Sequence, residues 1–384
     1  MSMKILVLNC GSSSIKYKLF DNGNKLTEGL VEKIGEKGSK IKTYKQGIDL
    51  MIKQILESGK IKSLEEMGAV GHRVVHGGML SKSCVIDKKV IKIIKKFSPL
   101  APLHNPVNLK GIIEMQKVLP KVKHVAVFDT AFHQTMPEHA YIYALPYEYY
   151  KKYGIRRYGF HGTSHKYVSQ RAAEILGKKF EDLNIITCHL GAGCSMAAVQ
   201  KGKVIDTSMG YTPLEGLVMG TRAGDIDAGI LIHLAQKMKM KPQEIDDLLN
   251  KKSGLFGLTG IAKDMRVAKE GYAKGDKRCK LAVEIFGYRL KKYIGAYAAA
   301  LGNVDAIVFT AGIGEHVPVI RTLSANIPCL GIKIDEKLNN EMIGKEGVIT
   351  TSESGVKVIV VPTDEEKMIA IETKRVIEGK NNDK

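Results

Sequence analysis

The sequence lacks the patterns that mark several common kinds of site. Its six cysteines are scattered and form no CxxC pair, which argues against a zinc ribbon and against a thioredoxin-like redox site. No apolar run approaches the length that spans a bilayer, and the run near the first residues is too short for a secretory signal. We therefore expect reduced thiols and a cytoplasmic protein without a membrane partner.

Acidic residues are scarce relative to basic ones. The chain has 59 Lys and Arg against 40 Asp and Glu, a formal charge of +19 at pH 7. Such a charge can attract nucleic acid or anionic small substrates. The basic residues are spread along the chain, and no basic arm or basic tract interleaved with aromatic residues is present. We expect a lysine-rich, solubilising surface and no nucleic-acid partner; a basic nucleic-acid-binding protein is the alternative.

The first 20 residues contain the most informative stretch. Residues 5–8 are an apolar run typical of a buried strand, and residues 15–20 alternate between apolar side chains and lysines, as in a strand with one wet face. The polar turn at 9–14 offers backbone N–H groups and hydroxyls to an anion, with Lys16 nearby. It is not a Walker loop, because it lacks GxxxxGK[ST] and a strand follows it. The alternative is an ordinary hairpin.

The rest of the chain alternates strands and helices, which predicts an α/β fold with a parallel or mixed sheet. Strands are expected at residues 25–31, 122–128, 184–188, 196–199, 204–206, 305–310 and 356–361, and residues 70–78 are expected to form a strand that runs into a flexible loop. Helices are expected at residues 44–58, 88–97, 228–240, 242–250 and 277–301. Further helices are expected to begin at residue 105 and, after residues 162–164, to run to a stop at Gly177. A last helix is expected to end near residue 377 and to be followed by a frayed tail. Asn105 and Thr363 read as helix N-caps, Thr363 in a capping box with Glu366.

The opening pattern occurs twice. The pattern is a strand, a glycine-rich turn, a second strand, another turn and a third strand. It begins at residue 4 and again near residue 184. A chain of 384 residues suggests two or three domains. The repeat predicts two similar domains around a central cleft that holds the ligand. We place one domain at 1–134 plus 368–384 and the other at 135–367, with the Pro- and Tyr-rich stretch 136–158 as the crossing.

Several polar residues follow predicted strands, where α/β active sites lie. Glycine-rich turns after strands at 9–14, 189–195 and 311–316 suggest phosphate binding. Arg73 and Arg222 stand in glycine-flanked loops and suit a carboxylate or a transferring phosphoryl group; surface salt bridges are the alternative. Asp129, between two phenylalanines, is either a desolvated functional group or a buried hydrogen-bonding residue.

Two further pairs have weaker signals. His161 and His165 have the spacing of a zinc helix but lack the HExxH glutamate, so we expect donors to an anion and no metal ligation. Asp225 and Asp227 precede a predicted helix, and we expect both to complement its dipole.

The chain resembles the acetate kinases, the acetokinase family of the acetate and sugar kinase/Hsp70/actin superfamily. The motifs that carry the resemblance run nearly end to end: NCGSSSIKY at 9–17, GHRVVHGG at 71–78, APLHNP at 101–106, FDTAFHQTMP at 128–137, YGFHGTSH at 158–165, HLGAGCS at 189–195, DTSMGYTPLEGLVMGTRAGDID at 206–227, TAGIGEH at 310–316 and TDEEKMIA at 363–370. The resemblance implies two ribonuclease-H-like (actin-like ATPase) cores, a homodimer, and reversible conversion of ATP and acetate to ADP and acetyl phosphate with Mg2+, for which Mn2+ can substitute.

The resemblance also implies residue roles by position. Asn9 and Glu365 would serve the metal, and Arg73 would hold the carboxylate. Asp129 would orient acetate or handle its proton, and Arg222 with His161 would stabilise the equatorial oxygens. The residues near the transferred phosphate would be Ser12, Ser14 and Lys16. The methyl pocket would consist of Val75, Leu103, Phe160 and Pro213. The ATP phosphates would lie at His189, Leu190, Gly191, Ala192 and Gly193. The adenosine would be flanked by Asp264, Met265, Arg266, Gly312, Ile313, Gly314, Glu315 and His316.

The chain departs from the family pattern at Ala192, His316 and Asp364, where asparagine is common. We expect these departures to affect the affinity for the nucleotide and the geometry of the metal site. Propionate or butyrate kinase is the nearest alternative, and the bulk of Val75 favours acetate. A non-catalytic ATP-binding switch of the actin or Hsp70 kind is a second alternative; the paired arginines and the acyl pocket argue against it.

Overall fold

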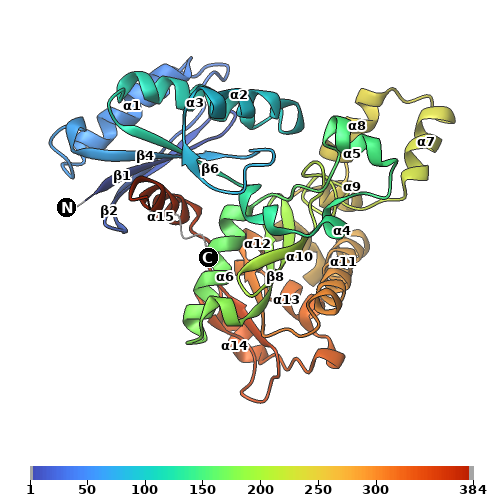
Figure 1. Ribbon diagram of the computed structural model, residues 1–384. Helices are drawn as coiled ribbons and strands as arrows, with labels where there is room; N and C mark the ends of the chain where they lie inside the picture. Colours follow the sequence, from blue (N-terminus) through green and yellow to red (C-terminus); the bar gives the residue numbers. More distant parts are fainter. Residues whose placement is uncertain (1–2, 380–384) are drawn as a thin grey trace. The chain divides into compact units, whose positions relative to one another are not determined.

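A computed structural model of the protein describes residues 3–379 (Figure 1). The chain forms two compact units. Unit 1 comprises the residues up to Gln134, the short segment Phe160–Ser164, and the residues from Asp364 onward. Unit 2 comprises Thr135–Gly159 and His165–Thr363, so the Pro- and Tyr-rich stretch belongs to unit 2. None of the helices within residues 3–379 combines the length and apolarity needed to cross a membrane.

Unit 1 is built on a mixed six-stranded sheet. Its strand order is β3 (Asn24–Val31), β2 (Ile15–Asp21), β1 (Lys4–Cys10), β4 (Met67–Val74), β6 (Lys123–Phe128) and β5 (Cys84–Val85). The first three strands are antiparallel and joined by tight turns, whereas β1, β4 and β6 run parallel. Parallel neighbours need long crossovers, which here contain α1 (Tyr44–Glu57), α2 (Lys88–Lys96) and α3 (Asn105–Val118).

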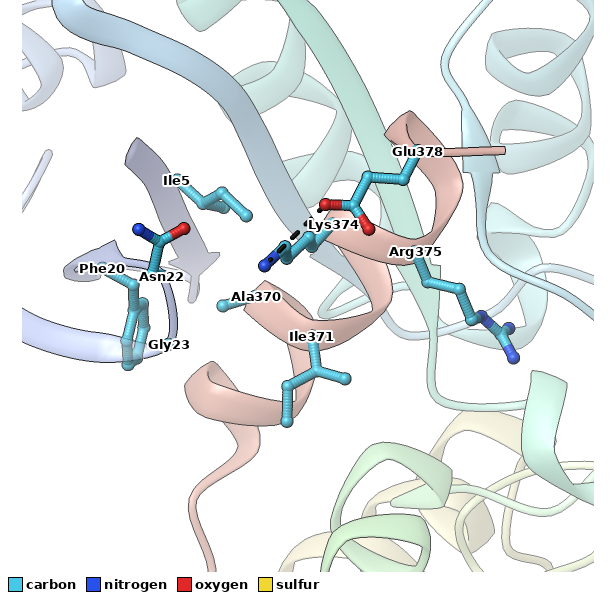
Figure 2. A pocket seen from close by; sticks show the side chains of 9 residues that line it. All are labelled: Ile5, Phe20, Asn22, Gly23, Ala370, Ile371, Lys374, Arg375 and Glu378. Carbon is cyan, nitrogen blue, oxygen red and sulfur yellow. Dashed lines mark ion pairs between the residues drawn. The ribbon is translucent and has the colours of Figure 1, made fainter. Parts of the chain in front are cut away.

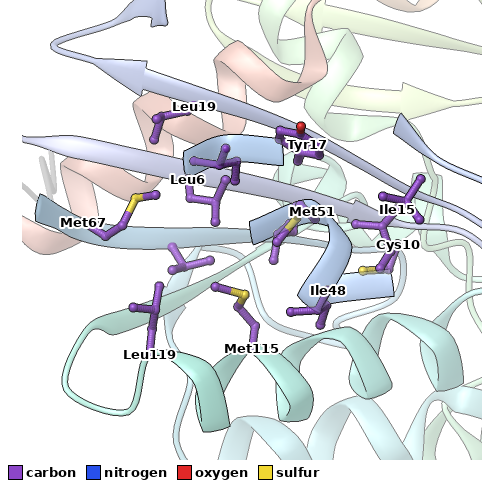
Figure 3. Packing of buried hydrophobic residues seen from close by; sticks show 14 of the residues in the cluster. Leu6, Cys10, Ile15, Tyr17, Leu19, Ile48, Met51, Met67, Met115 and Leu119 are labelled. Atoms are coloured by element: carbon purple, nitrogen blue, oxygen red, sulfur yellow. The ribbon is translucent and has the colours of Figure 1, made fainter. Parts of the chain in front are cut away.

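Helices cover both faces of this sheet. Because side chains alternate along a strand, Leu6 of β1 faces α1 and α3, while Ile5 faces α15 (Glu365–Ile377). Figure 3 shows the first face, where Met51 of α1 and Met115 of α3 point toward the strands. The other face packs against Ile369 of α15. The last helix of the chain thus completes the core of unit 1 (Figure 1).

Unit 2 repeats the sheet of unit 1. Its order is β9 (Lys203–Thr207), β8 (Cys194–Gln200), β7 (Asn184–Leu190), β10 (Ala306–Thr310), β12 (Lys357–Val360) and β11 (Gly347–Val348). Strand for strand, this is the order of unit 1, with β7, β10 and β12 parallel and β7, β8 and β9 antiparallel. The predicted architectural repeat is therefore confirmed, and it extends over both sheets.

The helices of unit 2 surround this sheet and extend from it. They are α4 (Glu138–Tyr141), α5 (Tyr147–Tyr153), α6 (Gly162–Ile175, which begins in unit 1), α7 (Ala228–Gln236), α8 (Pro242–Lys251), α9 (Gly254–Thr259), α10 (Met265–Ala273), α11 (Lys277–Leu301), α12 (Ala311–His316), α13 (Pro318–Ala325) and α14 (Glu336–Glu341). The longest, α11, packs on β8 and α13 and ends at Gly302, as its periodicity predicts.

Four local predictions were wrong. His104, not Asn105, is the N-cap of α3, because the Asn105 amide is used to bond the His76 backbone. Asp364, not Thr363, caps α15 by accepting from Lys367 N at 3.1 Å. Residues 311–316 form the short helix α12 and no open turn. Only Asp227 caps α7, since Asp225 bonds elsewhere. The predicted frayed tail, apart from Gly379, lies outside the described residues.

Candidate active site

The β1–β2 turn of unit 1 is a closed loop of small polar residues. Gly11 N donates to Ser14 O at 2.9 Å, and the Tyr44 hydroxyl donates to Gly11 O. Ser12 is exposed and Ser14 is half-buried, so the turn lies at the surface of unit 1. Lys16 lies on the wet face of β2, where its ammonium pairs with Glu366 at 3.0 Å. Such a turn can receive an anion.

Arg73 and Asp129 form an ion pair inside unit 1. The parallel register places Val74 of β4 opposite Phe128 of β6, so the residues at these strand ends meet. Arg73 Nη2 lies 2.8 Å from Asp129 Oδ2, and Arg73 Nε contacts both carboxylate oxygens. Burial alone would lower the pKa of Arg73, but the nearby Asp129 and Glu365 raise it above its usual value. Asp129 is 1% exposed, and its carboxylate accepts hydrogen bonds from Arg73 and Thr163.

The two predicted metal residues lie at the same arginine. Arg73 Nη1 donates to Asn9 Oδ1 at 3.4 Å and lies 3.8 Å from Glu365 Oε2. Burial and the neighbouring carboxylates of Asp129 and Glu366 raise the pKa of Glu365, against the effect of Arg73. An amide oxygen and a carboxylate fit Mg2+, which prefers oxygen ligands and keeps several waters. Among residues 3–379, no group of three or more His, Cys, Asp or Glu is placed to hold a metal.

The segment Phe160–Ser164 is bonded to Asp129, which explains why it belongs to unit 1. Gly162 N donates to Asp129 O at 2.9 Å, and Thr163 Oγ1 donates to Asp129 Oδ1 at 3.2 Å. A Cβ at Gly162 would lie 2.2 Å from Asp129 O, so no other residue fits there. His161 adopts a left-handed φ of +56° beside this glycine, a conformation that is uncommon outside glycine.

The predicted methyl-pocket residues differ in their surroundings. Val75 and Phe160 are buried in unit 1, and the Phe160 ring meets His76 edge-on at 5.6 Å. Leu103 also belongs to unit 1 but is 64% exposed, and Pro213 belongs to unit 2. Unit 1 therefore brings Arg73, Asp129, Asn9 and Glu365 together, but it does not bury Leu103.

In unit 2, the β7–β8 turn contacts the loop that carries Arg222. Gly191 N donates to Gly193 O at 3.0 Å, which closes the turn, and Ala192 is exposed. Gly220 N donates to Ala192 O at 3.1 Å. A Cβ at Gly191 would lie 3.8 Å from Ala311, the first residue of α12. The turn, the Arg222 loop and the start of α12 thus lie side by side.

Arg222 has no carboxylate partner among residues 3–379. Its Nη1 donates to Pro213 O at 3.1 Å and approaches Met219 Sδ at 3.6 Å. Burial lowers the pKa of its guanidinium, an effect that only the Cys194 thiol opposes. A desolvated cation without a counter-ion gains strongly from an anion that approaches it. The site can therefore bind a phosphoryl group.

The segments predicted to flank adenosine are built differently from each other. Asp264 caps α10 and pairs with Arg266 at 2.5 Å on the surface. In α12, His316 Nδ1 lies 3.2 Å from Gly312 O. The sequence analysis missed Arg321, whose buried guanidinium donates to Gly314 O at 2.9 Å and Glu315 O at 3.1 Å. A single arginine in a helix gives no sequence signal that its side chain will bond the backbone of another helix.

His165 was expected to donate to an anion, but its ring is used inside unit 2. Its Nδ1 and Nε2 lie 2.7 Å and 2.8 Å from the hydroxyls of Thr187 and Ser195. The side chain is fully buried, and its ring meets His189 edge-on at 6.2 Å. His165 therefore links α6 to β7 and β8.

A cavity of about 400 Å³ lies elsewhere in unit 1, between α15 and the end of the sheet where β1 begins and β2 turns into β3 (Figure 2). Its lining consists of Ile5, Phe20, Asn22, Gly23, Ala370, Ile371, Lys374, Arg375 and Glu378. None of the predicted site residues is among them.

The repeated mixed sheet and the glycine-rich turn after the first strand of each repeat define a class, the proteins of the actin-like ATPase fold. The Acetokinase family model matches residues 4–371. The acetate kinase of Thermotoga maritima is 55% identical over 98% of this chain and 99% of its own. Among solved structures, Porphyromonas gingivalis acetate kinase superposes with a TM-score of 0.93 at 48% identity, covering 98% of this chain and 100% of that one. A propionate kinase from Francisella tularensis gives 0.90 at 44% identity, covering 97% and 100%.

The chain belongs to the acetokinase family. It is an enzyme, a kinase of that family.

Proposed function

We propose that the phosphoryl group passes directly, in line, from ATP to the acetate carboxylate, with Arg222 stabilising the transferred group. The supporting observation is the half-buried Arg222 guanidinium, which has no carboxylate partner among residues 3–379 and lies in a loop bonded to the β7–β8 turn. Phosphoryl transfer depends mainly on positioning and charge stabilisation, and such a cation supplies the second. The β7–β8 turn, the Asp264 segment and α12 would bind the nucleotide.

We assign Arg73 to the acetate carboxylate and Asp129 to its orientation. A carboxylate is already ionised at neutral pH, so the reaction toward acetyl phosphate needs no general base. The short contact of Asp129 with Arg73 favours orientation over proton transfer. Mg2+, held by Asn9 and Glu365, would supply charge neutralisation on the phosphates when bound. Ser12, Ser14 and Lys16 would contact the transferred phosphate, and His161 with Arg222 would stabilise its equatorial oxygens.

We propose acetate as the preferred acid. We assign Val75, two residues after Arg73 and 5% exposed, to the wall of the acyl site, where its branched side chain would limit the space beside the carboxylate. Propionate is the second candidate, because the propionate kinase relative shares 44% of its sequence with this chain. One methylene changes binding by only about 1–3 kcal/mol, so some activity on propionate is expected.

We further propose a homodimer formed through α7. This helix reads AGILIHLAQ, yet Ile230 and Ile232 are 46% and 59% exposed, and Met238 just beyond it is 60% exposed. An apolar helix open to water marks an interaction surface, and a second copy of the chain is the partner that family membership suggests. Light scattering should give twice 42.2 kDa for the wild type and a lower mass for Ile232→Glu. A wild-type mass of one chain contradicts the dimer.

We also retain a cytoplasmic location as a proposal. All six cysteines are free thiols, and five of them are buried or half-buried. Cell fractionation with an antibody against the chain tests this location.

One assay tests the reaction and the substrate together. The purified protein is incubated with Mg-ATP, hydroxylamine and acetate, propionate or butyrate, and hydroxamate formation is recorded. We expect rapid product with acetate, less with propionate and little with butyrate. Faster product with propionate would overturn the acetate preference. ATP binding without product from any acid would overturn the proposed reaction and favour an ATP-dependent switch.

A further inference from the structure

The loop that carries Arg222 has no regular secondary structure, so its shape must be held by specific contacts. It covers residues 208–227, between β9 and α7, and it also carries Pro213. Gly216 and Gly224 have φ values of +108° and +70°. A Cβ at Gly216 would lie 2.6 Å from Ser208 O, and one at Gly224 would lie 2.4 Å from Leu217 O. The loop therefore folds back tightly on itself at these glycines.

Asp225 closes this fold. Its Oδ1 accepts from Gly216 N at 2.8 Å, and its own N–H donates to Gly216 O at 3.0 Å. These two bonds join the ends of the segment 216–225, in which Arg222 lies. Asp225 thus acts as a clasp on the part of the loop that contains the arginine.

Helix α11 holds the clasp in place. The Tyr293 hydroxyl donates to Asp225 Oδ2 at 2.7 Å, and burial, with the nearby Asp225 carboxylate, raises the pKa of Tyr293. Arg289 Nη1 donates to Gly216 O at 3.1 Å and to Asp225 O at 3.2 Å. Both side chains come from the same helix, which packs on β8 in the core of unit 2. The clasp is therefore fixed to a rigid element.

The same contacts keep Asp225 away from Arg222. A carboxylate three residues after an arginine is a natural ion-pair partner for a desolvated guanidinium. Yet Arg222 bonds Pro213 O, while the two Asp225 oxygens accept from Gly216 N and the Tyr293 hydroxyl. The arginine charge is left for an external anion.

We propose that Asp225 is a positioning residue for Arg222: bonded to Gly216 and Tyr293, it fixes the loop so that the guanidinium stays oriented and free of a carboxylate. In this role Asp225 acts through Arg222 and not by contact with nucleotide or acetate. This inference rests on the role proposed above for Arg222. It differs from the expectation that Asp225 merely complements the dipole of α7, a task that Asp227 performs by accepting from Gly229 N at 2.8 Å.

The first test is Asp225→Ala, assayed by hydroxamate formation. We expect kcat to fall roughly 30-fold, with the KM values for ATP and acetate within about threefold, because transition-state stabilisation is lost while substrate binding remains. Tyr293→Phe removes one hydroxyl and should lower kcat about threefold to tenfold. Asp227→Ala is the matched control, an acid two residues further on that contacts only the α7 N-terminus, and it should keep kcat within twofold.

A double-variant cycle separates positioning from general structural damage. If Asp225 acts through Arg222, then adding Asp225→Ala to Arg222→Ala should lower kcat by less than twofold further. Full multiplication of the two losses would overturn the inference, as would wild-type kcat in Asp225→Ala. Should Asp225→Ala fail to fold by circular dichroism, the same cycle with Tyr293→Phe decides, and an unchanged kcat in Tyr293→Phe overturns the inference.

The failure of the proposed function gives a different pattern. If Arg222→Ala keeps wild-type activity, the proposed role of Arg222 is wrong, whatever Asp225 does. If Arg222→Ala is severely impaired but Asp225→Ala and Tyr293→Phe are not, the proposed function stands and only the positioning role is wrong.

Discussion

Arg73 and Arg222 stand in similar glycine-flanked stretches, but their charges are balanced in different ways. Arg73, in unit 1, pairs with Asp129 at 2.8 Å and also lies near Glu365. Arg222, in unit 2, donates to the Pro213 carbonyl and has no ion pair among residues 3–379. The pKa of Arg73 is raised by its carboxylate neighbours against its burial, whereas burial lowers the pKa of Arg222.

The difference fits two tasks. A neutralised arginine in a fixed ion pair is oriented but attracts an added anion weakly, which suits a substrate such as acetate that must bind and leave. An unneutralised, desolvated arginine attracts negative charge strongly and suits the charge of a transferring phosphoryl group. In the proposed roles, the same residue type thus serves two tasks because its neighbours differ.

The largest effect should come from Arg222→Ala. Loss of a donor to developing charge costs about 100- to 1,000-fold in kcat, and we expect a value near the upper end. Stability should not fall, because the substitution removes a desolvated charge that has no protein counter-ion. Hydroxamate assays and urea unfolding measure both quantities, with the surface variant Arg171→Ala as control. If the kcat of Arg222→Ala stays within tenfold of the wild-type value, the proposed role of Arg222 as the unneutralised arginine is wrong.

Arg73→Ala should lower activity about 100-fold and also destabilise the protein. It leaves Asp129 buried without its partner, a change that costs about 3 kcal/mol in comparable pairs. The double variant Arg73→Ala with Asp129→Asn should regain most of the stability but none of the activity. If the urea midpoint of Arg73→Ala equals that of the wild type, the ion pair with Asp129 adds no stability, and the proposed difference between Arg73 and Arg222 is wrong.

Acid should weaken unit 1 through neutral buried histidines. Burial lowers the pKa of His133 to about 4, although its bond to Phe160 O and the nearby Asp129 oppose this shift. The unfolded chain binds this proton below about pH 6.5 and the folded one does not, so stability is full above pH 6.5 and falls as the pH drops toward 4.

The expected loss for His133 is about 1.4 kcal/mol per pH unit in that window. His133→Gln keeps an N–H donor for Phe160 O but does not titrate, so its urea midpoint should fall less steeply with acid. The exposed His139→Asn is the control and should match the wild-type slope. Parallel slopes for wild type and His133→Gln would show that His133 carries no such pH dependence.

The smallest expected effect is on the preference between acetate and propionate, the acids proposed to bind at Arg73. Val75→Ala creates space for about one methylene, so the preference for acetate over propionate should fall about tenfold. The ratio of kcat/KM values for the two acids measures it, with Val85→Ala, exposed on β5, as control. An unchanged ratio means that Val75 does not line the acyl site.

Much of the fold follows from local pattern. Three patterns are each visible in a short stretch of sequence. The apolar run at 5–8 predicts β1, the alternation at 15–20 predicts β2, and the helical spacing of apolar residues at 277–301 predicts α11; all three elements form there. The caps of α3 and α15 were misplaced by one residue because neighbouring polar residues compete for the same task. Asn105 is used by the His76 backbone, and Thr363 N donates instead to Glu315.

Sequence alone determined the repeated strand–turn–strand units, the segments they use and the arginines as candidate anion ligands. It could not determine which arginine is neutralised, because that depends on distance in space. Asp129 is 56 positions from Arg73 and reaches it only because β4 and β6 pair in parallel. Asp225 is three residues from Arg222 but is held away from it by Tyr293, which lies 68 positions further along the chain on α11. Hydrogen bonds made across the fold, and not proximity in sequence, set the charge that each arginine presents.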